Sequence, residues 1–364
     1  MATNKNQHFV PRCYLKAFTQ SGENLAINLF NLDRERVIQG APVKNQCSGD
    51  YFYGQDSLLE TAIQSIERGY AATIARIHAP SYQLTDADRA MLRTFMLFQH
   101  MRTEAASQRT AEMYAGVGNA FGESSTDFKL SIKEAVQMGM RAFSEEMHVI
   151  QDLKICLVRN RTSRPFVTSD DPAVFANRWY KEDPRVRHKS PGLLSSGAIF
   201  LLPLSTRVMC IAYDGDVYSI PHQSGWTEVK REPDVNAFNE LQFLNACANV
   251  YFRDWSDSDW VSSSFRSVKH RRLDCRHRIT YAVLDSMDGV HKRFRAVEGG
   301  HVDLTQEAIV HTQPQFPTPS RWPAQLQWRA KGCVYTNGTG TGYIRAAEEQ
   351  FMSTQGYWRE ASGH

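Results

Sequence analysis

The sequence lacks the patterns that define membrane-spanning and disulfide-stabilised proteins. No stretch approaches the roughly 18 consecutive apolar residues that a membrane-spanning helix needs, and the opening residues MATNKNQ contain no apolar run that could act as a signal peptide. The seven cysteines are odd in number and scattered, without a Cys-x-x-Cys pair, which argues against a disulfide framework and against a zinc ribbon. We therefore expect a cytoplasmic protein with reduced thiols and no membrane partner.

The common catalytic signatures are absent as well. The chain has no Gly-x-Ser-x-Gly, His-Glu-x-x-His or Gly-x-Gly-x-x-Gly motif and no phosphate-binding P-loop. Its formal net charge of +3 is small for 364 residues and does not by itself indicate nucleic acid. Apolar residues at 42% and charged residues at 22% are typical of a globular chain with a substantial core.

Positive charge is nevertheless concentrated in one segment. Between Arg266 and Arg295 there are nine Lys or Arg residues against three Asp. A basic stripe of this kind can neutralise phosphates, and its first part, Arg266, Lys269, Arg271 and Arg272, forms a candidate nucleic-acid contact. The alternative is a solvated face that acidic residues balance elsewhere in space.

Hydrophobic periodicity predicts a mixture of helices and strands. We expect a β-hairpin formed by residues 26–31 and 36–38, with its turn at 32–35. Helices are predicted at 57–78, from Thr85 past Ala106, at 131–150 and at 235–250. Short apolar runs predict strands at 155–158, 165–168, 198–202, 207–213 and 279–284. Asp214-Gly215 predicts a hairpin that joins 207–213 to Val217-Tyr218.

These elements predict an α+β fold, with a mixed or antiparallel sheet and a helical insertion packed against it. Residues 1–312 would form a single domain, mainly helical at 57–150 and mainly β, with one helix, at 152–300. Four prolines fall within positions 313–323. Because prolines at this density keep the backbone extended, we expect 313–364 to be a Pro-rich linker and C-terminal extension.

A polar cluster stands close to the N-terminus. Residues 7–12 place an amide, an imidazole and a guanidinium around Pro11. A chain terminus usually frays unless something holds it, so we expect Gln7, His8 and Arg12 to belong to a site.

This cluster opens the segment QHFVPRCYLKAF, and three later segments accompany it: QHMRTE (99–104), FVTSDDPAVF (166–175) and FLNACANVYF (243–252). These four boxes resemble those of an uncharacterised family, mostly bacterial with some fungal members, known as domain of unknown function 4238. In the second box, family members tend to read Arg-Thr-Pro where this chain has Glu104 after Thr103. The resemblance implies that the boxes act together, and it implies no reaction.

Each later box supplies candidate site residues. Gln99 and Arg102 share one helix face and could point into a cleft, although Arg102 could instead cap the helix end. Asp170 is favoured over Asp171, which precedes a proline, and the alternative for Asp170 is an Asx-turn that satisfies backbone amides. Asn245 is predicted to be buried and therefore needs hydrogen-bond partners.

Two further pairs, Arg93 with His100 and Arg272 with His277, match the loose Arg-x(4 to 6)-His spacing of metal-independent ribonucleases. Chance matches are expected in a chain with twelve His and many Arg.

Two functions follow from these candidates. In the first, a hydrolase or nuclease, acting as a bacterial defence or toxin-type effector, cleaves a phosphodiester or nucleotide. His8 would be the general acid or base, Arg12 and Arg102 would hold the anion, and Asp170 would orient His8 or bind Mg²⁺. In the second, these residues, together with Gln7, Gln99 and Asn245, form the pocket of a non-catalytic protein that binds a ligand or nucleic acid. An enzyme should bring His8 and Asp170 within hydrogen-bonding reach, whereas a binding protein would leave them apart or use them as caps.

Overall fold

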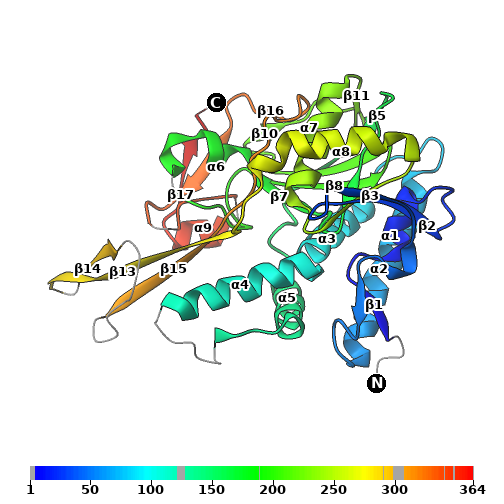
Figure 1. Cartoon of the computed structure of the whole chain (residues 1–364). Helices are drawn as coiled ribbons and strands as arrows, with labels where there is room; N and C mark the ends of the chain where they lie inside the picture. Colours follow the sequence, from blue (N-terminus) through cyan, green and yellow to red (C-terminus); the bar gives the residue numbers. More distant parts are fainter. Residues whose placement is uncertain are drawn as a thin grey trace.

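A five-stranded sheet with both faces buried organises the fold (Figure 1). The structure, a computed structural model, describes residues 5–120, 128–187, 189–289, 291–297, 307–339, 341–346 and 349–363. The sheet has the order β11-β5-β9-β8-β7, with β11 parallel to β5 and the other neighbours antiparallel. Its strands are β5 (Lys154–Asn160), β7 (Val174–Asn177), β8 (Ala198–Ser205), β9 (Val208–Tyr213) and β11 (Trp226–Val229).

A second, four-stranded antiparallel sheet has the order β3-β2-β12-β6. Its strands are β2 (Ala26–Asn31), β3 (Arg36–Pro42), β6 (Thr168–Ser169) and β12 (Asn249–Phe252). The predicted hairpin of β2 and β3 is confirmed. Two antiparallel pairs stand apart from these sheets: β1 (Asn6–His8) with β4 (Ser48–Asp50), and β10 (Tyr218–Ser219) with β16 (Gln327–Trp328).

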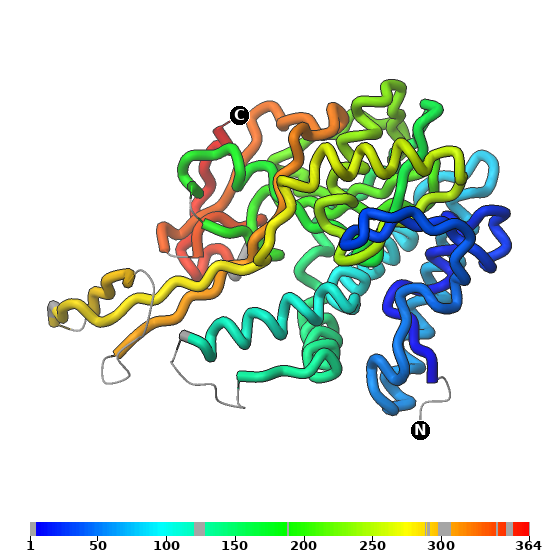
Figure 2. The backbone as a smooth tube through the Cα atoms, in the orientation of Figure 1, coloured from blue at the N-terminus to red at the C-terminus, as the bar shows by residue number. Residues whose placement is uncertain are grey.

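Two three-stranded sheets complete the described β-structure. One contains β14 (His291–Val297), β13 (His277–Asp288) and β15 (Ala308–Pro314), and it extends from the body as an arm (Figure 2). The other contains β18 (Tyr343–Ile344), β17 (Cys333–Thr336) and β19 (Trp358–Ala361). The C-terminal residues pack against earlier elements, since the Trp179 indole donates to the Ser362 carbonyl at 2.8 Å.

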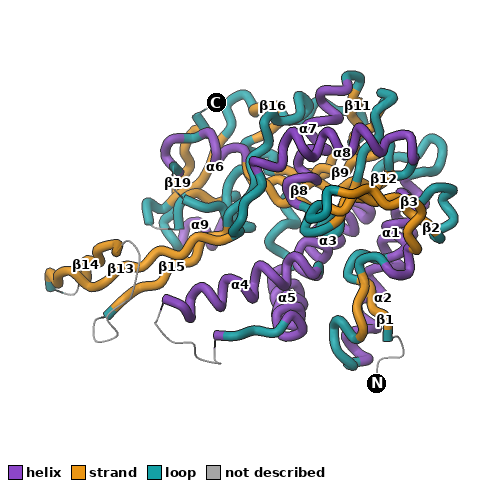
Figure 3. The backbone as a smooth tube through the Cα atoms, in the orientation of Figure 1, coloured by secondary structure: helices purple, strands orange, loops and turns teal. Residues whose placement is uncertain are grey.

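The long helices α2 to α5 follow one another in the stretch between β4 and β5, and Figure 3 distinguishes the helices from the strands by colour. Their bounds are α1 (Arg12–Leu15), α2 (Ser57–Ile77), α3 (Asp86–Arg102), α4 (Glu104–Ala120), α5 (Ile132–Glu146), α6 (Arg178–Glu182), α7 (Glu232–Asn245), α8 (Ser258–Val268) and α9 (Glu349–Thr354). The predicted α+β class is thereby confirmed. Among the helices described, none combines the length and the apolar character that crossing a bilayer requires.

Successive side chains of β5 point to opposite faces of the central sheet, and each face carries its own part of the core. Ile155 and Leu157 pack with the apolar residues of α2, α3 and α5, whereas Cys156 and Val158 pack with α6, α7 and the C-terminal segment. Because both faces are covered, the strands read as nearly continuous apolar runs. A third cluster joins α8 to the four-stranded sheet.

Helix starts follow the local sequence. Asp56 caps α2, Thr85 caps α3 by accepting from the Asp88 amide at 3.2 Å, and Ser131 with Glu134 forms a capping box at α5. On α2, Leu58 is 80% exposed at the start of the helix, whereas Ile63 is buried. Helix α8 was not predicted.

The predicted continuous helix from Thr85 past Ala106 is wrong at one residue. Thr103 is extended, with φ −73° and ψ 159°, and it ends α3. Its hydroxyl accepts from the Ala106 amide at 3.1 Å and so begins α4. Glu104 occupies the first position of α4, a position that proline also favours, so the backbone there suits either residue.

The hairpin predicted at Asp214-Gly215 is also wrong. Strand β9 pairs with β5 and β8, while β10 pairs with β16 from the C-terminal segment. The Asp214 carboxylate accepts from the amides of Gly197 and Asp216 at 2.7 and 2.9 Å, and the chain leaves the sheet there. The helix predicted at 235–250 ends at Asn245, because the next residues turn to bind Asp170.

Phe95 of α3 is the most direct test of this packing. Its ring is fully buried and stacks on Tyr70 of α2 with 3.7 Å between ring centroids. We expect Phe95→Ala to lower the free energy of unfolding by about 3–5 kcal/mol, since truncation leaves a cavity. The control Leu58→Ala, at the exposed start of α2, should change it by less than about 0.5 kcal/mol. Urea denaturation of both variants measures the difference, and equal losses would contradict the helix placement.

Candidate functional site

The first two boxes hold each other through hydrogen bonds. Arg102 is fully buried, and its guanidinium donates to the Tyr53 hydroxyl at 2.7 Å, the Glu67 carboxylate at 2.9 Å and the His8 carbonyl at 2.5 Å. Gln99 donates to the Phe9 carbonyl at 2.7 Å. These contacts fix the N-terminal strand on α3, so the donors of Arg102 are engaged by protein groups.

A small cavity of about 200 Å³ lies beside this contact and is lined by His8, Arg12 and Arg102 among others. Gln7 at its edge accepts from the Tyr53 amide at 2.8 Å and donates to the Gly54 carbonyl at 3.1 Å. Burial, with a smaller contribution from Arg12, lowers the pKa of His8. The structure therefore brings His8, Arg12 and Arg102 together, and Asp170 is not among the residues that line this cavity.

Asp170 holds a loop. Its carboxylate accepts from the amides of Cys247, Ala248 and Asn249 at 2.8, 2.7 and 2.9 Å. Both oxygens are therefore engaged, which leaves the carboxylate poorly placed to orient His8 or to ligate a metal ion. In the part of the chain that the structure describes, no three His, Cys, Asp or Glu side chains are grouped to hold a metal.

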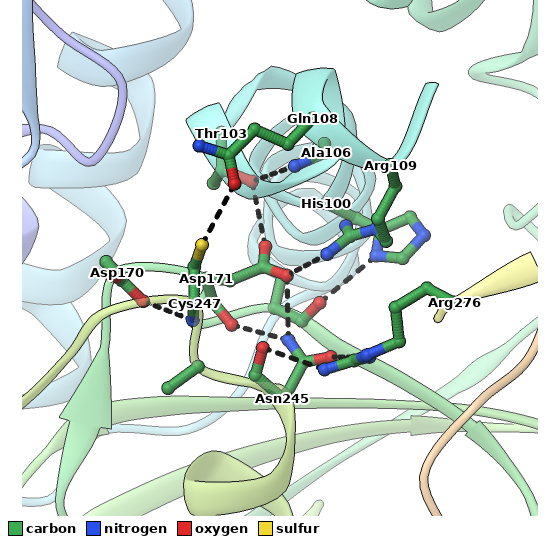
Figure 4. A network of polar contacts seen from close by, with 12 residues as sticks. His100, Thr103, Ala106, Gln108, Arg109, Asp170, Asp171, Asn245, Cys247 and Arg276 are labelled. Carbon is green, nitrogen blue, oxygen red and sulfur yellow. Dashed lines mark hydrogen bonds and ion pairs between the residues drawn. The ribbon is translucent and has the colours of Figure 1, made fainter. Parts of the chain in front are cut away.

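Asp171 occupies the centre of a second network, drawn in Figure 4. Its fully buried carboxylate accepts from the Thr103 hydroxyl at 2.8 Å, Arg109 Nη1 at 2.6 Å and Asn245 Nδ2 at 3.0 Å. Arg276 lies on the other side of Asn245 and donates to its Oδ1 at 3.3 Å. Asp170 thus binds backbone amides, as the alternative interpretation allowed although the amides belong to a distant segment, whereas Asp171 binds side chains of three segments.

Helix α7 positions this network with three amide side chains spaced three residues apart on one face. Asn239 accepts from the Val167 amide at 3.0 Å and donates to the Pro165 carbonyl at 2.9 Å. Gln242 donates to the Pro172 carbonyl at 2.9 Å, and Asn245 donates to the Asp171 carbonyl at 2.7 Å. The third box is therefore held along its length by the helix that precedes the fourth.

A cavity of about 430 Å³, here named the α4 cavity, opens beside the Asp171 network. Residues of α3, α4, α5, the loop at 191–193 and the base of the β13–β15 arm line it. Its polar lining includes His100, Arg109, Asn245, Arg276 and His277. Its apolar walls include Met113, Tyr114, Met138, Phe175 and Phe316.

The charged groups at the α4 cavity do not balance. Arg109 and Arg276 lie near one buried carboxylate, that of Asp171. Burial and the neighbouring Arg109 lower the pKa of Arg276 to about 10, so its guanidinium remains protonated at neutral pH. Since no acidic residue lines the α4 cavity within the described chain, the site has surplus positive charge.

His100 contributes no charge to this site. Its Nδ1 lies 3.2 Å from the Ala173 carbonyl. Because a carbonyl oxygen can only accept a hydrogen bond, Nδ1 carries the proton of the neutral ring and Nε2 is unprotonated. Burial, followed by the nearby Arg109, lowers the pKa of His100 to about 4. The ring therefore stays neutral at physiological pH.

The four basic residues predicted to contact nucleic acid have different partners and do not form one surface patch of free charges. Arg266 and Lys269 bind Glu35 at 3.0 and 2.5 Å. Arg272 donates to the carbonyls of Phe243 and Ala246 at the end of α7, both at 2.8 Å. Arg271 donates to the Thr318 carbonyl at 3.2 Å and remains partly exposed.

Of the predicted substrate-binding residues, Asn245 lines the α4 cavity, whereas Gln7 and Arg12 line the N-terminal cavity. Sequence reasoning missed Arg109 and Arg276. The histidines of the two Arg-x(4 to 6)-His pairs, His100 and His277, line the α4 cavity, whereas their arginines do not. Arg93 donates to the Leu153 carbonyl, and Arg272 donates to the Phe243 carbonyl of α7. The signal that could have found Arg276 is its position next to His277.

Comparison with protein families matches residues 6–256 to a family described as a protein of unknown function (DUF4238). The chain belongs to this family. A comparison with curated proteins and another with solved structures each found no match.

The depressed pKa of His100 makes stability depend on pH. In the unfolded chain His100 becomes protonated below its ordinary pKa of 6.5, whereas in the folded protein it becomes protonated only near pH 4. The free energy of unfolding is therefore highest above pH 6.5 and decreases as the pH falls from 6.5 to 4. The loss reaches roughly 3 kcal/mol at the low end of this window. We expect His100→Asn, which keeps a donor for Ala173, to be less stable at pH 7 but to lose less on acidification. Urea titrations across this window compare the slopes, and parallel slopes would contradict the buried neutral ring.

Proposed function

We propose that the α4 cavity binds a nucleotide unit, meaning a phosphate joined to a planar base. The observation that carries this proposal is the pair Arg109 and Arg276, which share a single buried carboxylate at the polar side of an otherwise apolar cavity. A bound phosphate supplies the second negative charge, and guanidinium groups are well suited to phosphate oxygens.

The apolar walls support the same ligand class. Tyr114, Phe316 and the methionines offer contact surface for a planar base, and about 430 Å³ is within the size range of small-molecule sites. The engagement of Asp170 by three backbone amides supports binding over metal-assisted hydrolysis. All seven cysteines are free thiols, which accords with the cytoplasmic location that we propose.

Arg276→Gln tests this proposal, because it keeps hydrogen-bond donors and removes the charge. Loss of a charge-assisted hydrogen bond costs about 1.5–3 kcal/mol, so we expect the Kd for nucleoside monophosphates to rise roughly 10- to 100-fold. Isothermal titration calorimetry measures it. The control Arg36→Gln, on exposed β3, should bind as wild type does.

Because Arg276 also donates to the Leu244 carbonyl at 2.8 Å, the variant could lose stability. Met113→Glu is therefore the second variant, since it places a negative charge on the apolar wall without touching the Asp171 network. Both variants should melt as cooperative folded proteins and bind weakly. Wild-type protein that binds none of the nucleotides would overturn the proposal, as would two folded variants that bind them normally.

A second candidate is the hydrolysis of a phosphodiester or nucleotide, in a bacterial defence or toxin-type role. It is favoured by His100 and His277, which line the same cavity as the two arginines and could exchange protons with a bound phosphate ester. His100 with its pKa near 4 could accept a proton but would be a weak base.

If this candidate holds, wild type should cleave RNA, single-stranded DNA or nucleotides without added metal. His100→Asn and His277→Asn should then slow cleavage by about 10² to 10⁴, the contribution of a positioned acid or base. Product analysis by chromatography measures the rates, and growth arrest on expression in bacteria, relieved by His277→Asn, would support the defence role. If the wild-type protein cleaves none of these substrates, the hydrolase candidate is wrong and the binding function is the one that remains.

A further inference from the structure

A second cavity of about 580 Å³ adjoins the α4 cavity. Pro191, Pro314, Gln315 and Phe316 line both cavities, so they form the wall between them. The second cavity, here named the basic cleft, contains five basic side chains: Lys181, Arg187, Lys189, Arg271 and Arg278. No acidic residue lines it within the described ranges.

The charges of the basic cleft are largely uncompensated. Lys181, Arg187, Lys189 and Arg278 are exposed, and none of them forms an ion pair with another described residue. Arg271 alone has a carboxylate nearby, that of Glu240 at 3.7 Å. Arg266 and Lys269, by contrast, both form ion pairs with Glu35, which separates this cleft from that part of the basic stripe.

Phe316 stands where the two cavities meet. Its ring is partly exposed and is held edge-on by Phe175, with 4.8 Å between ring centroids. A fixed aromatic ring between two cationic cavities is the arrangement that proteins use to bind single strands, in which bases stack on aromatic side chains while basic residues follow the backbone.

We infer that the two cavities together bind a single-stranded nucleic acid, with one nucleotide in the α4 cavity and the adjoining phosphates in the basic cleft. This inference rests on the proposed nucleotide binding. It adds that the ligand is a single strand and not a free nucleotide. A duplex fits less well, since its bases are paired and cannot enter a lined cavity to reach Phe316.

The experiment compares a nucleoside monophosphate, a dinucleotide, a hexanucleotide and a decanucleotide, each as RNA and as DNA, by fluorescence anisotropy. Affinity should rise with length beyond one nucleotide. The double variant Arg187→Glu/Lys189→Glu should bind the monophosphate as wild type does and the longer strands at least roughly tenfold more weakly. Its binding should also depend less on salt, with a logarithmic slope shallower by about 0.7 for each phosphate that is no longer neutralised.

The matched control is Arg36→Glu/Lys44→Glu, which changes the net charge equally at exposed residues outside both cavities. It should leave strand binding within about twofold of wild type, because screening at physiological salt limits the effect of distant charges. Equal losses of affinity in the two double variants would mean attraction by net charge alone and would overturn the inference.

The remaining outcomes separate the inference from the proposed function. If the monophosphate binds through Arg276 but longer strands bind no tighter, the inference fails and the proposed function stands. If neither monophosphate nor strand binds, both fail. Equal affinity for inorganic polyphosphate or for duplex of the same charge would also overturn the single-strand inference, while a preference between RNA and DNA would identify the source of the strand.

Discussion

The buried carboxylate of Asp171 is the constraint on which the site depends. An ionised group without solvent must be paired and hydrogen-bonded, because an uncompensated buried charge costs several kcal/mol. Thr103, Arg109 and Asn245 meet that requirement from the junction of α3 with α4, from α4 itself and from α7. Segments that lie more than 60 residues from Asp171 in the sequence, on either side, are thereby brought to one point, and the α4 cavity is the space left beside it.

The four boxes have distinct structural roles. The first is tied to the second by Arg102 and Gln99, and the third is held by the amides of α7 and by Asp171. The fourth receives the Asp170 carboxylate on three amides just after α7 ends. Most of the polar residues that stand out in the sequence therefore form hydrogen bonds that hold distant segments together. The residues that face the α4 cavity, above all Arg276, lie partly outside the boxes.

Sequence patterns predicted local structure well where one short-range signal decided it. The helix starts at Ser57, Asp86 and Ile132 follow from capping residues, and the hairpin of β2 and β3 follows from its polar turn. The break at Thr103 escaped prediction because the apolar pattern continues across it, although its hydroxyl caps α4 locally and also donates to Asp171, 68 residues away. The sequence also favoured Asp170 as a site residue and did not predict the network around Asp171. Tertiary contacts with α7 decide which of the two carboxylates binds backbone amides and which binds cationic side chains. The hydrophobic periodicity of the sequence does not encode these contacts.

The double role of Thr103 limits how the shape of the α4 cavity can change. One hydroxyl both starts α4 and binds Asp171, so the direction of α4 is set by the same atom that anchors the charged side of the α4 cavity. A change in the direction of α4 would therefore disturb the hydrogen bond to the buried carboxylate. The size of the α4 cavity can change through side chains farther along α4 and at the rim around Phe316, because these leave the hydrogen bond between Thr103 and Asp171 in place.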